Sequence, residues 1–256
     1  MNNLLSIPAL AFFELTLFES NSSNRAPVTY RQSVLAKAFY PFVGLVLGSF
    51  LVLIHKTADS VLPEDIADLF VIAGMTFFSN GKHLEGLVLN LQKVLTWKLT
   101  KPFWRASGKI LKMPPLVGIM VIATLCLWLF GLSLAPFDFK SQIILVVPIA
   151  ANWGMALFTF DNAWKLIKNN ELEKNDETIS WKESFSALAL AFAFTFTCFG
   201  FLLKLKGVLI LFIMTVFLMV IIKVTSMLKH EFNKSTLGVV HEFSGIAFLF
   251  FAYCTL

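Results

Sequence analysis

A short segment at residues 76–87 places a histidine, a glutamate and two glycines directly after an apolar stretch. Its chemically useful members are His83 and Glu85, flanked by Gly81 and Gly86. Ionisable residues are costly beside lipid and usually mark a functional site there. This segment is therefore the first place to look for chemistry.

The composition is that of a membrane protein. The 256 residues are 57% hydrophobic and 14% charged and include 28 phenylalanines, and the mean hydropathy is +0.75. A soluble domain could not bury so much apolar surface. The net charge of +5 fits basic loops beside anionic lipid and predicts no nucleic acid partner.

Several windows reach the roughly 20 apolar residues that a helix needs to cross the hydrocarbon core. We predict an all-α integral membrane protein, a single polytopic domain over residues 1–256 with about seven transmembrane helices. The predicted spans are 34–54, 67–89, 114–135, 142–160, 184–203, 207–228 and 239–256.

The first 20 residues are apolar but form too short a segment for a span. They contain Glu14 and have neither a basic start nor a distinct cleavage site, so a removed signal peptide is not expected. We predict that this segment is kept as a re-entrant or interfacial helix.

Lysine and arginine alternate between rich and poor loops, as the bias toward cytoplasmic basic loops predicts. The first span is then entered from the cytosol. Residues 91–112 become a cytoplasmic interfacial segment and residues 161–183 a cytoplasmic connector. Segments 80–93, 109–118 and 230–242 also fall on the cytoplasmic side, where they could share one site.

Two motifs suggest a family. Residues 38–48 contain Phe39, Pro41, Gly44 and Gly48 at the entry to the first span. The second motif is Asn80-Gly81-Lys82-His83-Leu84-Glu85-Gly86-Leu87. The chain resembles the cobalamin synthase family, the membrane adenosylcobinamide-GDP ribazoletransferases. That resemblance implies a transferase that joins α-ribazole phosphate to adenosylcobinamide-GDP, releases GMP and uses Mg²⁺.

The resemblance also implies the roles of individual residues. Catalytic roles fall on His83, Glu85, Lys112 and Glu242, with Glu85 as the metal ligand. Substrate-binding roles fall on Gly81, Gly86, Asn152 and Gly238. A location in a bacterial inner membrane, with the site facing the cytoplasm, is the expectation from the same resemblance and from the charge pattern.

The chain departs from the family where metal-binding aspartates are expected. Those positions are occupied by Leu89, Gln92, Met113 and Ser235, and Asn152 replaces a family arginine. Mg²⁺ prefers several hard oxygen ligands, and Glu85 alone remains from the first row of carboxylates. The sequence therefore favours a degenerate member in which catalysis is lost or altered.

Three interpretations of this segment stay open. The site could still catalyse the family reaction with other ligands, or His83 and Glu85 could be a polar pair at a helix end. A third possibility is a re-purposed pocket for a corrinoid, a nucleotide, a lipid headgroup or a softer metal such as zinc. That pocket would be formed by His83, Glu85, His230, His241 and Glu242. A non-catalytic structural or regulatory subunit, bound to another membrane protein, is the alternative function.

Overall fold

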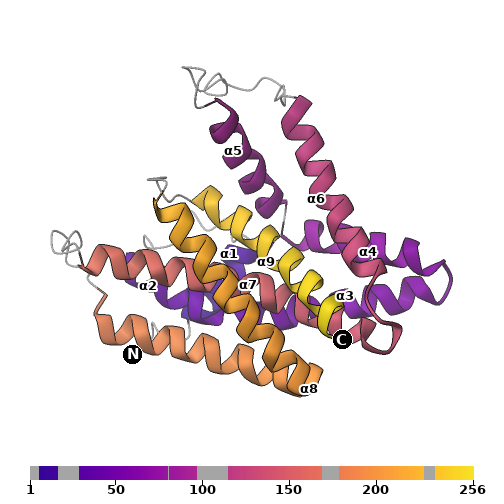
Figure 1. Ribbon diagram of the computed structural model, residues 1–256. Coiled ribbons are helices and arrows are strands. Elements are labelled where there is room, and N and C mark those ends of the chain that lie inside the picture. Colours follow the sequence, from indigo (N-terminus) through magenta and orange to yellow (C-terminus); the bar gives the residue numbers. More distant parts are fainter. Residues whose placement is uncertain (1–5, 17–28, 80, 97–114, 169–178, 228–233) are drawn as a thin grey trace.

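A computed structural model describes residues 6–16, 29–79, 81–96, 115–168, 179–227 and 234–256 (Figure 1), and within these ranges the secondary structure is entirely helical. The predicted all-α class is confirmed. The α-helices are α1 Ser6–Leu15, α2 Tyr30–Ala36, α3 Tyr40–Asp59, α4 Glu64–Phe78, α5 Lys82–Thr96, α6 Pro115–Ser133, α7 Lys140–Lys168, α8 Trp181–Met227 and α9 Lys234–Thr255. Two 3₁₀ turns, η1 Lys37–Phe39 and η2 Phe137–Phe139, precede α3 and α7.

Long apolar helices give the chain its membrane character. Four helical segments in the described residues are long and apolar enough to cross a bilayer. They are Tyr30–Asp59, Phe137–Lys165, Trp181–Lys223 and Thr236–Thr255. A shorter apolar helix, Val117–Ser133, lies within the predicted span 114–135. The total of seven crossings stays a prediction.

Helix α8 is too long for one crossing. Its 47 residues would extend about 70 Å as a straight helix, more than twice the roughly 30 Å hydrocarbon core. The backbone leaves helical geometry at Lys204, where φ is 56° and ψ is −144°. Figure 1 shows the two limbs running in opposite senses from this point. The limbs coincide with the predicted spans 184–203 and 207–228.

The Lys204 conformation is one that side chains rarely adopt, because a Cβ crowds the backbone at positive φ. Replacing Lys204 with glycine is expected to raise the free energy of unfolding by about 1 kcal/mol. Leu205→Gly, one residue into the following limb, is expected to lower it by about 0.5–1 kcal/mol. Reversible unfolding in mixed detergent micelles measures both changes, and equal destabilisation by the two glycines would contradict the turn at Lys204.

The predicted span 67–89 is not one helix. Helix α4 ends at Phe78 and α5 begins at Lys82. Between them Gly81 has a φ of +66°, a value that glycine tolerates and other residues rarely do. The change of direction carries the family motif away from the axis of α4, so His83 and Glu85 begin a separate helix.

Helix α7 forms the centre of the bundle, packed against α3, α8 and α9. Its apolar stretch is 89% buried inside the protein. Gly44 and Gly48 of α3 lie against the α7 backbone, and a Cβ on Gly48 would come within 2.3 Å of the Leu145 carbonyl oxygen. Small residues four apart allow such close helix contact in membranes. The first motif therefore serves packing of α3 on α7.

The N-terminal segment does contain a helix, α1, packed on α2 and α3. Glu14 accepts a hydrogen bond from the Tyr40 hydroxyl at 2.8 Å and forms an ion pair with Lys37. These contacts explain a carboxylate in an otherwise apolar helix, because a charge removed from water requires a partner. A re-entrant or interfacial position for α1 stays a prediction.

Candidate functional site

The site forms where α5 crosses the first half of α9. Gly238 of α9 faces α5 so closely that a Cβ on it would lie 2.6 Å from the His83 carbonyl oxygen and 2.9 Å from the Gly86 Cα. The backbones of segments 81–86 and 238–242 are therefore in direct contact. The loop charges predict that segments 80–93 and 230–242 lie on the same side of the membrane, and a contact between them requires this.

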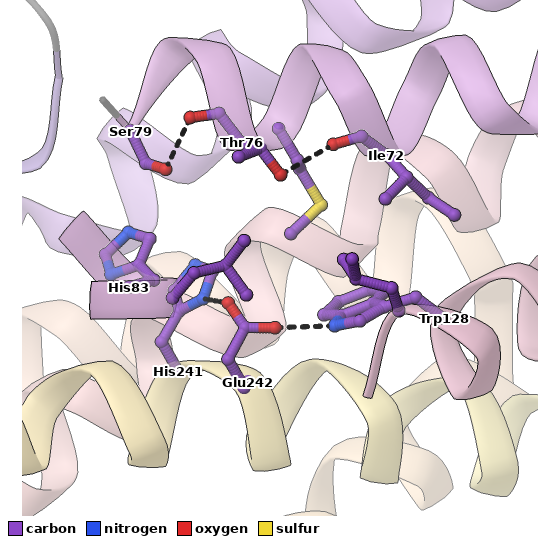
Figure 2. A pocket seen from close by; sticks show the side chains of 10 residues that line it. Ile72, Thr76, Ser79, His83, Trp128, His241 and Glu242 are labelled. Carbon is purple, nitrogen blue, oxygen red and sulfur yellow. Dashed lines mark hydrogen bonds and ion pairs between the residues drawn. The ribbon is translucent and has the colours of Figure 1, made fainter. Parts of the chain in front are cut away.

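Two histidines stack across this contact. The rings of His83 and His241 lie 3.6 Å apart between centroids and are nearly parallel, at 11° (Figure 2). Removal from water is the main cause that lowers the pKa of His83 well below its usual range, and the nearby His241 and Lys82 act in the same direction. His83 is therefore a neutral imidazole at pH 7, able to accept or donate a hydrogen bond.

Glu242 lies beside the stacked rings and is 5% exposed. The indole Nε1 of Trp128, on α6, donates a hydrogen bond of 2.6 Å to Glu242 Oε2. The other oxygen, Oε1, lies 3.4 Å from His241 Nδ1. Figure 2 shows the carboxylate between the two side chains. Both carboxylate oxygens are thus directed toward protein groups from α6 and α9.

A cavity of about 20 Å³ opens among these groups. Polar walls come from Thr76, Ser79, His83, His241 and Glu242, and the remaining lining is Ile72, Met75, Leu84, Leu125 and Trp128. A cavity needs a volume of at least about 10–15 Å³ to hold one water molecule. The space accommodates about one water, and a corrinoid or a nucleotide would require the helices to separate.

The structure brings together part of the predicted pocket. His83, His241 and Glu242 line one cavity, whereas Glu85 is exposed and does not line it. His230 and Lys112 lie outside the described residues. The convergence expected of the re-purposed pocket therefore holds for three of its five members.

The predicted substrate-binding residues lie around the site. Gly86 and Gly238 form the contact between α5 and α9, and Gly81 forms the turn before α5. Asn152 is buried between α7 and α3, where its amide donates a 3.1 Å hydrogen bond to the Tyr40 carbonyl. Asn152 does not line the cavity. Substrate binding by these four residues stays a prediction.

A comparison with protein families finds a match to the N-terminal part of the chain. The family model of cobalamin-5-phosphate synthase matches residues 9–88. Over these residues the chain is similar to the cobalamin-5-phosphate synthase family. The match runs from α1 into α5 and includes His83 of the cavity and the exposed Glu85, whereas Glu242 lies beyond it. No curated protein and no solved structure gave a match.

The family implies Mg²⁺, and the described residues do not fit that ion. Glu85 is exposed, and Leu89 follows it one turn later. Glu242 already faces Trp128 and His241. Among the residues that the structure describes, no three His, Cys, Asp or Glu side chains are grouped to hold a metal. The stacked rings of His83 and His241 are nearly parallel, so their nitrogen lone pairs do not point at one ion. This geometry argues against a zinc ion bound by both histidines.

Three further positions at which the resemblance leads us to expect an aspartate are described only in part or not at all. The backbones of Gln92 and Ser235 belong to α5 and α9, but their side chains are not described, and Met113 lies outside the described residues. That these positions correspond to metal-binding aspartates of the family, and that their residues alter metal binding, stays a prediction.

Sequence reasoning missed Trp128 and Ser79 as parts of the site. A tryptophan inside an apolar helix carries an N–H that needs an acceptor when it is buried. Trp128 is 2% exposed, and that requirement could have directed attention to a carboxylate on a neighbouring helix. Ser79 gave no comparable indication in the sequence. Its hydroxyl needs no distant partner, because it donates a 3.1 Å hydrogen bond to the nearby Thr76 carbonyl.

Proposed function

We propose that the chain is a member of the cobalamin-5-phosphate synthase family that has lost or altered the family reaction. That reaction joins α-ribazole phosphate to adenosylcobinamide-GDP and releases GMP. The observation that carries the proposal is the engagement of Glu242, whose two carboxylate oxygens face Trp128 Nε1 and His241 Nδ1. A carboxylate held in this way is poorly placed to serve as a metal ligand.

The chemistry of the family reaction explains why the loss of a carboxylate ligand for the metal would impair catalysis. Attack on a phosphoanhydride builds negative charge that a divalent cation normally shields. Carboxylates hold that cation. Here Glu85 is exposed, and leucine occupies the next aspartate position, Leu89.

The alternative is a non-catalytic structural or regulatory subunit of a membrane complex. It is favoured by the roles that the remaining motif residues have in packing. Gly86, Gly238 and the His83 backbone bring α5 against α9, and Glu242 ties α9 to Trp128 of α6. These contacts would hold the fold together after the loss of catalysis. The bilayer is the expected surrounding, and a corrinoid or a nucleotide is a possible ligand.

The deciding experiment is GMP release by the purified protein in liposomes. The assay contains Mg²⁺, adenosylcobinamide-GDP and α-ribazole phosphate, and an active family enzyme is the positive control. We expect no GMP above that from protein-free liposomes. GMP release that disappears in Glu85→Gln or Glu242→Gln would overturn the proposal and show that these carboxylates still support turnover.

We further propose that the chain lies in a bacterial inner membrane with the α5–α9 contact facing the cytoplasm. The support is the alternation of basic and non-basic loops in the sequence. The exposed position 85 offers a test. In a background without the three native cysteines, Glu85→Cys should react with a membrane-impermeant maleimide in inverted vesicles and not in intact cells. Labelling in intact cells would reverse the orientation.

A further inference from the structure

The cavity beside the α5–α9 contact is lined by polar atoms that the surrounding protein leaves without a partner. His241 Nδ1 is buried and has no hydrogen-bond partner among the described residues. Glu242 Oε1 is 3.4 Å away, but this contact lacks the geometry of a hydrogen bond. Buried polar atoms that no protein group reaches are usually paired with an ordered water. Both groups of α9 therefore require a partner inside the cavity.

The opposite wall of the cavity carries hydroxyl groups of α4. Thr76 Oγ1 donates a 3.0 Å hydrogen bond to the Ile72 carbonyl, and Ser79 Oγ donates one of 3.1 Å to the Thr76 carbonyl. A hydroxyl has one hydrogen and two lone pairs, so each of these groups can still accept a hydrogen bond. Figure 2 shows the two hydroxyls on the α4 side of the cavity, across from His241 and Glu242.

The size and the chemistry of the cavity match a water molecule. Its volume of about 20 Å³ holds about one water. An anion would be repelled by the Glu242 carboxylate, and an apolar group would leave the polar walls unpaired. A metal ion would need several ligands, and among the described residues no three His, Cys, Asp or Glu side chains are grouped for one. Water both donates and accepts, so it can pair with either neutral form of His241 and with the carboxylate.

We propose that the cavity binds one ordered water molecule, held by His241 Nδ1 and Glu242 Oε1 of α9 and by a hydroxyl oxygen of α4. A buried water typically makes about three hydrogen bonds, and these three groups supply them. The water links the end of α4 to the first half of α9. This site does not depend on the proposed function, because it requires no substrate and no turnover.

The test is hydroxyl-radical labelling of the full-length protein in liposomes by a short X-ray exposure, with oxidation of each tryptophan measured by mass spectrometry. The radicals form from water, so a bound water oxidises the buried side chains beside it. Trp128 lines the cavity and is 2% exposed. Trp153 is 1% exposed, donates to Thr215 Oγ1 and does not line the cavity. We expect oxidation of Trp128 to be at least about threefold faster than that of Trp153, because only Trp128 adjoins a bound water.

A space-filling substitution locates the water. Ser79→Val replaces the hydroxyl with a methyl group and adds a second one, which occupies the space of the water. The ratio of Trp128 to Trp153 oxidation should then fall to about one, because too little volume remains for a water. Ser49→Val is the matched control and should keep the wild-type ratio. Ser49 also donates to a carbonyl of its own helix, but it is exposed and does not line the cavity.

Two results would overturn the water site. One is equal oxidation of Trp128 and Trp153 in the wild type, and the other is a wild-type ratio that Ser79→Val leaves unchanged. The second result would mean that Trp128 is oxidised from bulk solvent and not from a bound water. The wild-type comparison decides the matter even where Ser79→Val does not fold.

Discussion

Replacing Gly238 with alanine is expected to destabilise the protein by about 2 kcal/mol, since forcing an extra methyl group into a packed interior typically costs about 1–3 kcal/mol. The added Cβ would lie 2.6 Å from the His83 carbonyl oxygen and 2.9 Å from the Gly86 Cα. Both neighbours are backbone atoms, so no side chain can rotate away. Helices α5 and α9 must separate, and the stacked histidines separate with them.

Gly200 in α8 provides the matched control for this substitution. A Cβ there meets a Val208 methyl group at 3.6 Å, which is an ordinary contact. Alanine in a helix is favoured over glycine by about 0.5–1 kcal/mol. Gly200→Ala should therefore stabilise the protein while Gly238→Ala destabilises it, as measured by reversible unfolding in mixed micelles. A Gly238→Ala variant as stable as the wild type would contradict the close contact of α5 and α9.

The second large effect is expected at Lys140. Lys140→Met removes the cation that faces Asp68, a carboxylate with 0% exposure. Removing one partner of a buried ion pair typically costs about 3–5 kcal/mol, because the other charge remains buried without compensation. The same unfolding measurement should show a loss of this size, and a loss below about 0.5 kcal/mol, the range of neutral surface changes, would contradict the role of the ion pair.

A double variant distinguishes the effect of the lost charge on stability from the effect of the changed side-chain packing. Lys140→Met combined with Asp68→Leu removes both charges, so most of the stability should return. Lys206→Met is the control for the substitution itself, because Lys206 is exposed and, among the described residues, donates to the Leu256 carbonyl. Its effect should stay within about 0.5 kcal/mol. A double variant no more stable than Lys140→Met would assign the loss to packing and not to charge.

Apolar length made most of the fold predictable. Long runs without charge can satisfy their backbone only as helices in a membrane, so α3, α7, α9 and the two limbs of α8 follow from the sequence. The break at Gly81 was harder to predict, because residues 67–89 are apolar enough for one span. Whether a glycine bends the chain depends on its tertiary contacts, and here α5 turns to meet α9.

The candidate site was predictable only where a family motif drew attention to it. His83 and Glu242 could be paired through the resemblance, and the structure places both at one cavity. Glu85, by contrast, is exposed, because helical geometry turns residue 85 about 200° away from residue 83. Asp68 has its partners His55 and Lys140 at separations of 13 and 72 residues, and no local pattern signals such pairs.

The most direct test of the site is a disulfide between positions 83 and 241. In a background with Cys126, Cys198 and Cys254 replaced by serine, His83→Cys with His241→Cys places two thiols where the rings now stack at 3.6 Å. A disulfide requires Cβ atoms about 4 Å apart. We predict rapid cross-linking on mild oxidation in liposomes, seen by mass spectrometry, and none for the control pair Glu85→Cys with His241→Cys. Absence of the 83–241 disulfide, or equal cross-linking of both pairs, would contradict the convergence of α5 and α9 on one site.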